Sequence, residues 1–176
     1  VLGVLGGLVV TGGLIGVAVI AFSQDSTADQ LTAGMDAYFV KIDPILTEFN
    51  DDRESYNTVA RRVDTEARTE ISPTRRMRLY TELVNAAKNR HARVQSQLIG
   101  LDQALPPLSL AQYHQHQTEV FVLTTRFLNA IQWAYDLSVS DTGRDLAYER
   151  ATTLHQEVAV LQDQLLEELK SLGLDQ

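Results

Sequence analysis

Four polar side chains fall at otherwise apolar positions of this sequence, and they are the residues best placed to do chemistry. They are Asp52, His91, Gln117 and Thr124. Asp52 precedes a predicted chain reversal near residue 71 by about as many residues as His91 follows it, so we expect the two to face one another. A carboxylate beside an imidazole raises the imidazole pKa, which suits ligand binding or proton sensing. A hydrogen-bonded polar layer that sets helix register is the other interpretation.

Arginines surround the same predicted reversal. Between residues 61 and 93 the chain carries nine basic and four acidic residues, whereas the whole chain has a net charge of −8. Guanidinium groups bind carboxylates in a bidentate geometry, so this cluster is suited to docking an acidic protein surface. Acidic residues are interleaved with it, so a self-neutralised, solvated helix surface is the alternative. The arginines of the cluster are Arg61, Arg62, Arg68, Arg75, Arg76 and Arg78.

Composition and motifs argue against an enzyme. Cysteine is absent, which excludes thiolate metal sites, cysteine nucleophiles and covalently attached haem. No Glu-x-x-His pair, H-E-x-x-H motif or phosphate-binding loop occurs. Met35 and His155 do not reach one level as axial haem ligands would, and His114 and His116 point to different helix faces. We expect no catalytic residue, metal or cofactor, and the acidic net charge argues against nucleic acid as a partner.

The elements that position these residues are predicted to be helices. Residues 23–176 are rich in Leu, Ala, Gln, Glu and Arg, which favour helix. Ser72-Pro73, Pro106-Pro107 and Asp141-Thr142-Gly143 are the main interruptions. Each segment between them carries apolar residues three and four positions apart, and we expect Pro44 only to kink the first. The predicted buried rows include Ala87, His91, Val94, Leu98 and Leu101 in the second segment, Gln117, Val120, Thr124, Phe127 and Ile131 in the third, and Val158, Leu161 and Leu165 in the fourth. The prediction is an all-α, up-down antiparallel four-helix bundle with helices over about 27–71, 73–104, 108–140 and 143–172.

The first 22 residues, Val1 to Phe22, contain no charged residue. About 20 apolar residues cross a bilayer as a helix, so residues 1–22 are predicted to be a single transmembrane anchor. A cleaved signal peptide is the alternative, although its apolar region is usually shorter. The first charges after the span are acidic, which places the bundle on the extracytoplasmic side of the membrane.

Glycine is concentrated in this predicted anchor. Small residues four positions apart let membrane helices approach closely. Two such pairs point to opposite sides of the helix, which predicts contacts with other transmembrane subunits as well as with lipid. General enrichment of glycine in membrane helices is the alternative. The residues concerned are Gly3, Gly7, Gly12 and Gly16.

A membrane helix that runs into an extracytoplasmic four-helix bundle resembles the sensor domains of chemoreceptors. Those proteins have a second membrane span, whereas this chain ends at Gln176 on the outer side. The leading hypothesis is therefore a non-enzymatic accessory or structural subunit of a larger membrane complex, such as a respiratory or photosynthetic one. A ligand- or pH-sensing bundle is the first alternative, and a pilin-like filament subunit is the second.

Overall fold

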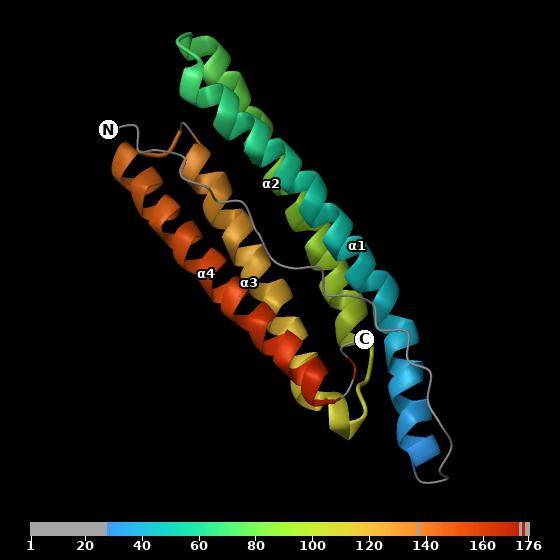
Figure 1. Ribbon diagram of the computed structural model, residues 1–176. Coiled ribbons are helices and arrows are strands. Elements are labelled where there is room, and N and C mark those ends of the chain that lie inside the picture. The colour runs from blue at the N-terminus through green and yellow to red at the C-terminus, as the bar shows by residue number, and fades with distance from the viewer. Residues whose placement is uncertain (1–27, 137, 173, 175–176) are drawn as a thin grey trace.

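The computed structural model describes residues 28–136, 138–172 and 174, and their regular structure is entirely helical. Four long helices lie side by side in bundle-like packing, and no strand occurs in these ranges (Figure 1). The predicted all-α class and the number of helices are therefore confirmed. The elements are α1 (Ala28–Thr69), α2 (Pro73–Asp102), the short 3-10 helix η1 (Leu108–Leu110), α3 (Ala111–Tyr135) and α4 (Asp141–Ser171).

The helix starts follow from side-chain caps. Ser72 precedes α2, and its hydroxyl accepts a hydrogen bond from the Arg75 amide at 3.5 Å, as the Ser72-Pro73 pair predicts. Helix α4 begins two residues before the predicted position because Ser140 is its N-cap. The Ser140 hydroxyl accepts from the amide of Gly143 at 3.2 Å, so the predicted turn residue Gly143 lies in the first helical turn.

Helix α3 is shorter than the sequence pattern predicted. Its last residue is Tyr135, whereas the prediction extended it to 140. The Asp136 carboxylate accepts from the Ser138 amide at 2.9 Å and from the Ser138 hydroxyl at 2.7 Å. This local turn takes the place of helical hydrogen bonds and ends the helix.

Helix α1 remains one helix through Pro44, as expected. At 42 residues it is the longest element, and the hairpin of α1 and α2 extends beyond the turn between α3 and α4 (Figure 1). Proline removes one backbone donor but leaves the following helix intact, since the apolar positions continue in phase on both sides. Ile42 and Phe49 are both buried, one on each side of the proline.

The helices run alternately up and down, and close packing joins α1 to α2, α2 to α3, and α3 to α4 (Figure 1). Helices α1 and α4 do not pack with comparable closeness in the described part of the chain. Aromatic side chains bridge the centre instead: Phe49 of α1 stacks on Phe121 of α3 with ring centroids 4.2 Å apart. The described bundle thus has three packed edges and one looser edge between α1 and α4.

The core confirms the predicted apolar face of α3 and corrects those of two other helices. In α2 the buried positions are Leu83, Ala87, Arg90, Val94, Gln97 and Leu101. The prediction placed His91 and Leu98 in this row, one residue away from Arg90 and Gln97. In α4 the buried row passes through Gln162, whereas Leu161 was predicted. In both helices the observed row passes through polar side chains, Arg90 and Gln97 in α2 and Gln162 in α4, which apolar spacing does not select.

The predicted anchor, residues 1–22 with Gly3, Gly7, Gly12 and Gly16, lies outside the described residues. Of the helices that the structure does describe, none has both the length and the apolar content needed to span a bilayer. The anchor remains a prediction from the sequence.

Candidate functional site

The predicted contact between Asp52 and His91 is absent from the described structure. Asp52 is buried, and its carboxylate accepts from Arg93 Nε at 2.7 Å and from Gln97 Nε2 at 2.9 Å. Ile45 lies against Gly100 and Arg62 pairs with Glu82, which sets the register of the α1–α2 hairpin. In that register the level of Asp52 is near residue 93, about two residues beyond the count from the chain reversal.

His91 lies at the border of the core. The side chain is half-buried, and its Nε2 atom finds no hydrogen-bond partner among the described residues. The buried row of α2 passes through the preceding residue, Arg90, so His91 points to the side of the seam. Asp52 and His91 therefore do not form one polar pair.

Gln117 and Thr124 are both buried in α3, as expected, but they belong to different surroundings. Gln117 donates a hydrogen bond from Nε2 to the Tyr113 hydroxyl at 3.0 Å, within its own helix. Burial raises the Tyr113 pKa to about 12, and the hydrogen bond from Gln117 opposes this shift. Thr124 faces the cavity described below. The predicted layer therefore does not form: Asp52, Gln117 and Thr124 have separate surroundings, and His91 Nε2 has no partner among the described residues.

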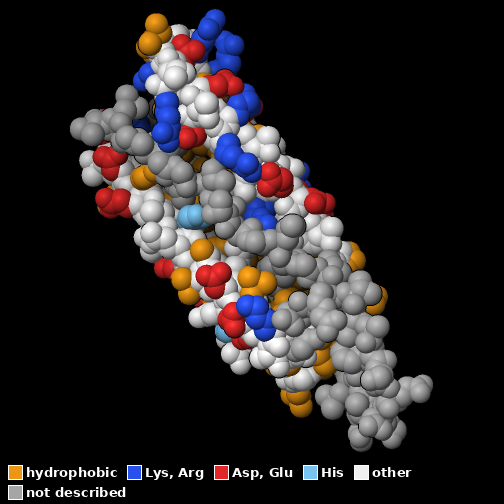
Figure 2. Space-filling model, viewed as in Figure 1, with side chains coloured by type: hydrophobic (Ala, Val, Ile, Leu, Met, Phe, Trp, Pro, Cys, Tyr) orange, Lys and Arg blue, Asp and Glu red, His pale blue; other side chains and the backbone are white. Residues whose placement is uncertain are grey.

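Most arginines of the cluster at the α1–α2 tip form ion pairs with acidic residues of the same hairpin. Arg61 contacts Glu54 at 2.8 Å, Arg68 contacts Asp64 at 2.9 Å, and Arg75 lies 3.9 Å from Glu70. Arg62 pairs with Glu82, and Arg76 donates to the backbone carbonyl of Glu70. Figure 2 shows blue and red side chains interleaved at this end of the molecule. The arrangement favours the solvated-surface interpretation, with Arg78 exposed and unpaired among the described residues.

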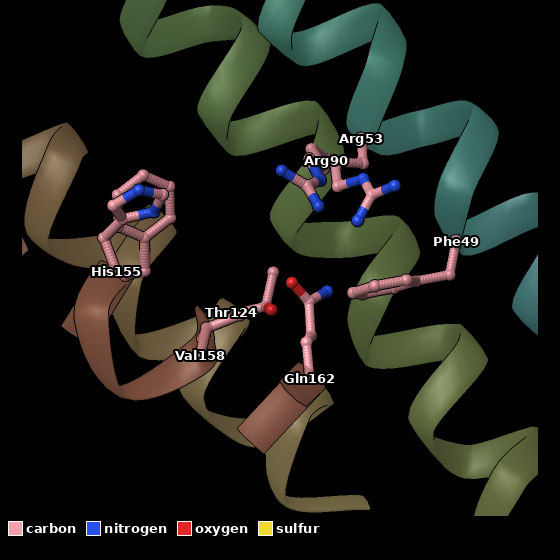
Figure 3. A pocket seen from close by; sticks show the side chains of 8 residues that line it. Phe49, Arg53, Arg90, Thr124, His155, Val158 and Gln162 are labelled. Carbon is pink, nitrogen blue, oxygen red and sulfur yellow. The ribbon is translucent and has the colours of Figure 1, made fainter. Parts of the chain in front are cut away.

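A site that the sequence analysis missed lies where the four helices meet. Two arginines, Arg53 of α1 and Arg90 of α2, are buried side by side at its edge (Figure 3). Arg90 is 2% exposed and Arg53 is 6% exposed. No carboxylate in the described ranges forms an ion pair with either of them. Arg90 Nε and Nη1 and Arg53 Nη1 find no hydrogen-bond acceptor there.

The arginine pair is electrostatically unusual because charged groups are rarely buried without a partner. Burial lowers the pKa of Arg90 to about 10, with Tyr56 opposing and Arg53 reinforcing the effect. Burial also lowers the pKa of Arg53, with Glu54 opposing. The nearby carboxylates are engaged elsewhere: Asp52 with Arg93, and Glu54 with Arg61. Asp52 partly offsets the charge of Arg90 from a distance, but among the described residues no carboxylate lies within ion-pair distance of either arginine.

Aromatic rings hold the Arg90 guanidinium in place. Its central carbon lies 5.6 Å from the centroid of the Phe49 ring and 5.4 Å from that of Tyr56. Such contacts stabilise a cation through the ring quadrupole, and they matter most where water is excluded. The Nε and Nη1 groups of the same guanidinium have no acceptor among the described residues and are available to bind one.

The other wall of the site comes from α3 and α4. Gln162 points its amide toward the two arginines, and His155, Val158 and Thr124 lie opposite them (Figure 3). The Gln162 oxygen is buried without a donor among the described residues. Burial lowers the His155 pKa and so favours the neutral imidazole. The enclosed volume open to the centre of a water molecule is about 10 Å³, room for about one water.

A sequence signal for this site was present. Arg90 and Gln97 lie at the spacing of the buried row of α2, but a charged residue is usually assigned to the surface. Only the structure shows that the whole helix is rotated to bury Arg90.

This arrangement can bind an anion: it offers two fixed guanidinium groups, an amide and an apolar wall. It holds no pair of acid and base groups aimed at a common point and, in the described residues, no cluster of metal ligands. Comparisons with protein families, with curated proteins and with solved structures find no match to this chain.

Proposed function

We propose that this chain is a non-enzymatic, ligand-binding four-helix sensor domain whose ligand is a small anion held between Arg53 and Arg90. The proposal takes the first alternative from the sequence, a ligand-sensing bundle, and relocates its site. The up-down antiparallel arrangement matters because it brings α1 and α2 to one side of the ligand and α3 and α4 to the other.

One observation carries the proposal: two guanidinium groups are buried without an anionic partner among the described residues. Burying a charge costs several kcal/mol unless it is paired, and a bound anion provides that pairing. Charge-assisted hydrogen bonds to guanidinium are also about twice as strong as neutral ones. An anion therefore stabilises the folded state more than it stabilises the unfolded chain.

The looser α1–α4 edge supports a sensing role. Arg53 belongs to α1, while Gln162 and His155 belong to α4, so a ligand at the cavity contacts both helices. A ligand that binds the closed arrangement better than the open one shifts the population toward the closed arrangement. Binding at this edge thus converts anion concentration into a change in helix packing.

The test is ligand-dependent stability of the full chain, purified in mild detergent. Thermal unfolding is followed by circular dichroism with sodium salts of chloride, formate, nitrate, acetate, sulfate, phosphate and glutamate at matched ionic strength. At a ligand concentration of about 100 times Kd, one site adds about 2.7 kcal/mol to the free energy of unfolding. We expect at least one anion to raise the melting temperature of the natural chain.

Arg90→Met is the variant that removes the site, and Arg78→Met is the matched control at an exposed arginine. The anion effect should disappear in Arg90→Met and persist in Arg78→Met. If every anion acts equally on the natural chain and on folded Arg90→Met, the arginine pair is not a ligand site and the proposal fails.

The hypothesis of an accessory subunit remains a prediction that rests on residues 1–22. Its support is the uncharged, glycine-rich segment, since the paired arginine cluster weakens the argument for an acidic docking partner. Mild-detergent extraction of native membranes, followed by sizing and mass spectrometry, tests it. A fixed set of co-migrating membrane proteins would support the accessory role, whereas migration alone or as a homodimer would refute it.

A further inference from the structure

We infer that the ligand of the Arg53–Arg90 site is a single small planar oxyanion, of the size and shape of formate, nitrate or acetate. The inference rests on the proposed function, that the arginine pair binds an anion. It goes further by naming the chemical class of the anion, because the size of the cavity, the direction of its donors and the nature of its walls restrict which anions fit.

The size of the cavity limits the ligand to a few atoms. The described arrangement has room for about one water molecule, at about 10 Å³. A planar ion of three or four heavy atoms requires a small widening, which the loosely packed α1–α4 edge allows. Phosphate and sulfate have five heavy atoms, and an amino acid such as glutamate has ten, so these require separation of the helices.

The free donors of Arg90 lie in one plane. A guanidinium group is planar, and the Nε and Nη1 groups of Arg90, which have no acceptor among the described residues, donate in that plane. Edge donors in one plane match the two coplanar oxygens of a carboxylate or nitrate. A tetrahedral anion would direct at least one oxygen out of this plane, away from these donors.

The wall opposite the arginines accepts a flat, partly apolar ligand. Val158 and Phe127 are buried there, and the Phe127 ring lies 6.1 Å from that of His155. Gln162 is the polar group on this side that points toward the arginines (Figure 3). Exchanging its amide oxygen and nitrogen, which occupy similar volumes, turns two donors toward the anion. The methyl group of acetate would lie against Val158.

The decisive measurement is isothermal titration of the full chain with formate, nitrate, acetate, sulfate, phosphate, glutamate and chloride. We expect at least one of the three planar ions to bind with one-to-one stoichiometry. The Kd of that ion should be at least about tenfold lower than the Kd of sulfate, phosphate, glutamate or chloride. Arg53→Met and Arg90→Met should each weaken the binding by at least about tenfold, while Arg78→Met should not.

The outcomes separate the two proposals. Tighter binding of sulfate, phosphate, glutamate or chloride, lost in Arg90→Met, would overturn the planar class and leave the anion-binding function intact. Absence of any anion binding that depends on Arg90 would overturn both. Circular dichroism of each variant establishes that the bundle is folded before the titration is interpreted.

A second variant tests the size limit without removing an arginine. Val158→Ala shortens the side chain against which the acetate methyl would lie and so enlarges the cavity there. Val160→Ala, at an exposed valine on the same helix, is the matched control. We expect Val158→Ala to lower the ratio of the propionate Kd to the formate Kd by about tenfold, which corresponds to about 1.4 kcal/mol. Val160→Ala should leave that ratio unchanged. An unchanged ratio in Val158→Ala as well would refute the placement of the ligand against this wall.

Discussion

The guanidinium carbon of Arg90 lies 5.4 Å from the centroid of the Tyr56 ring, and both side chains are almost fully buried. This contact joins α2 to α1 in the middle of the bundle. It stabilises a cation that has no carboxylate partner within the described structure. Because burial lowers the pKa of Arg90 from 12.5 to about 10, at about 1.4 kcal/mol per unit the charged form is penalised by about 3 kcal/mol. A ligand-free bundle therefore carries a stability penalty at its own binding site.

Removing that charge should stabilise the ligand-free protein. Methionine is an unbranched apolar side chain that adapts to irregular core space, and its sulfur can form favourable contacts with the Phe49 and Tyr56 rings. Replacing a buried, unpaired charge by an apolar side chain of similar volume is often neutral or stabilising by about 1–4 kcal/mol. We expect Arg90→Met to raise the free energy of unfolding in urea by up to about 2 kcal/mol without added anion.

The control for this prediction is Arg78→Met, an exposed position where we expect a change within about 0.5 kcal/mol. A loss of more than about 1 kcal/mol in Arg90→Met would contradict the prediction. In that case the cation–π contacts with both rings would outweigh the desolvation of the charge.

Asp52 should be important for stability through Arg93 and Gln97. Its carboxylate accepts from both and ties α1 to α2. Truncation leaves the buried Gln97 amide without its acceptor and removes a charge-assisted bond. We expect Asp52→Ala to lower the free energy of unfolding by about 2 kcal/mol, and Asp51→Ala, an exposed neighbour, to change it by less than about 0.5 kcal/mol.

The same experiment tests the predicted pairing of Asp52 with His91. Residues without shared contacts have additive effects within about 0.5 kcal/mol. We therefore expect the double variant Asp52→Ala/His91→Ala to equal the sum of the single changes. A coupling energy above about 1 kcal/mol would show that the two side chains do interact.

How far the sequence predicted this fold is clear from α2. The spacing of Ala87, Val94 and Leu101 correctly predicted a helix with one buried row. Those residues fit a row through His91 almost as well as a row through Arg90, because the two differ by one position. Hydrophobicity assigns a guanidinium to solvent, so the sequence argument chose the histidine. The deciding contacts come from Phe49 and Tyr56 on another helix, which helical spacing alone does not reveal.

The candidate site shows the same limit. Gln117 and Thr124 were correctly placed in the core because they lie at the spacing of the apolar row of α3. The neighbours of Asp52 depended on hairpin register, and a shift of about two residues replaced His91 by Arg93 and Gln97. Counting residues from a chain reversal assumes that its position is known and that both helices start equally far from it. Helix α1 ends at Thr69, two residues before the predicted end. Register is thus the information that the sequence lacked.

Stability should fall below pH 6.5 because of two histidines. Burial lowers the pKa of both His155 and His114 in the folded state. As the pH decreases through 6.5, the unfolded chain takes up protons before the folded chain does, so the free energy of unfolding decreases. The effect levels off once the pH is below the folded pKa. We expect urea unfolding between pH 7.5 and about 5.5 to show this decrease.

His155→Gln and His114→Gln should each reduce the slope, and the double variant should remove most of it. The chosen pH window stays above the ordinary range of carboxyl titration, so aspartate and glutamate contribute little. A slope of unchanged size in the double variant would mean that other groups control the acid response.

The N-cap of α4 should contribute to the integrity of the wall that holds His155 and Gln162. The Ser140 hydroxyl accepts from the Gly143 amide at 3.2 Å, and alanine removes this acceptor. Loss of a serine cap typically costs about 1 kcal/mol, so we expect that decrease in the free energy of unfolding for Ser140→Ala. Ser140→Asp keeps an acceptor and adds a negative charge at the helix N-terminus, so it should retain at least the natural stability. Ser109→Ala, at an exposed serine in η1, serves as the control. Equal losses in Ser140→Ala and Ser140→Asp would show that the cap hydrogen bond does not determine the stability of α4.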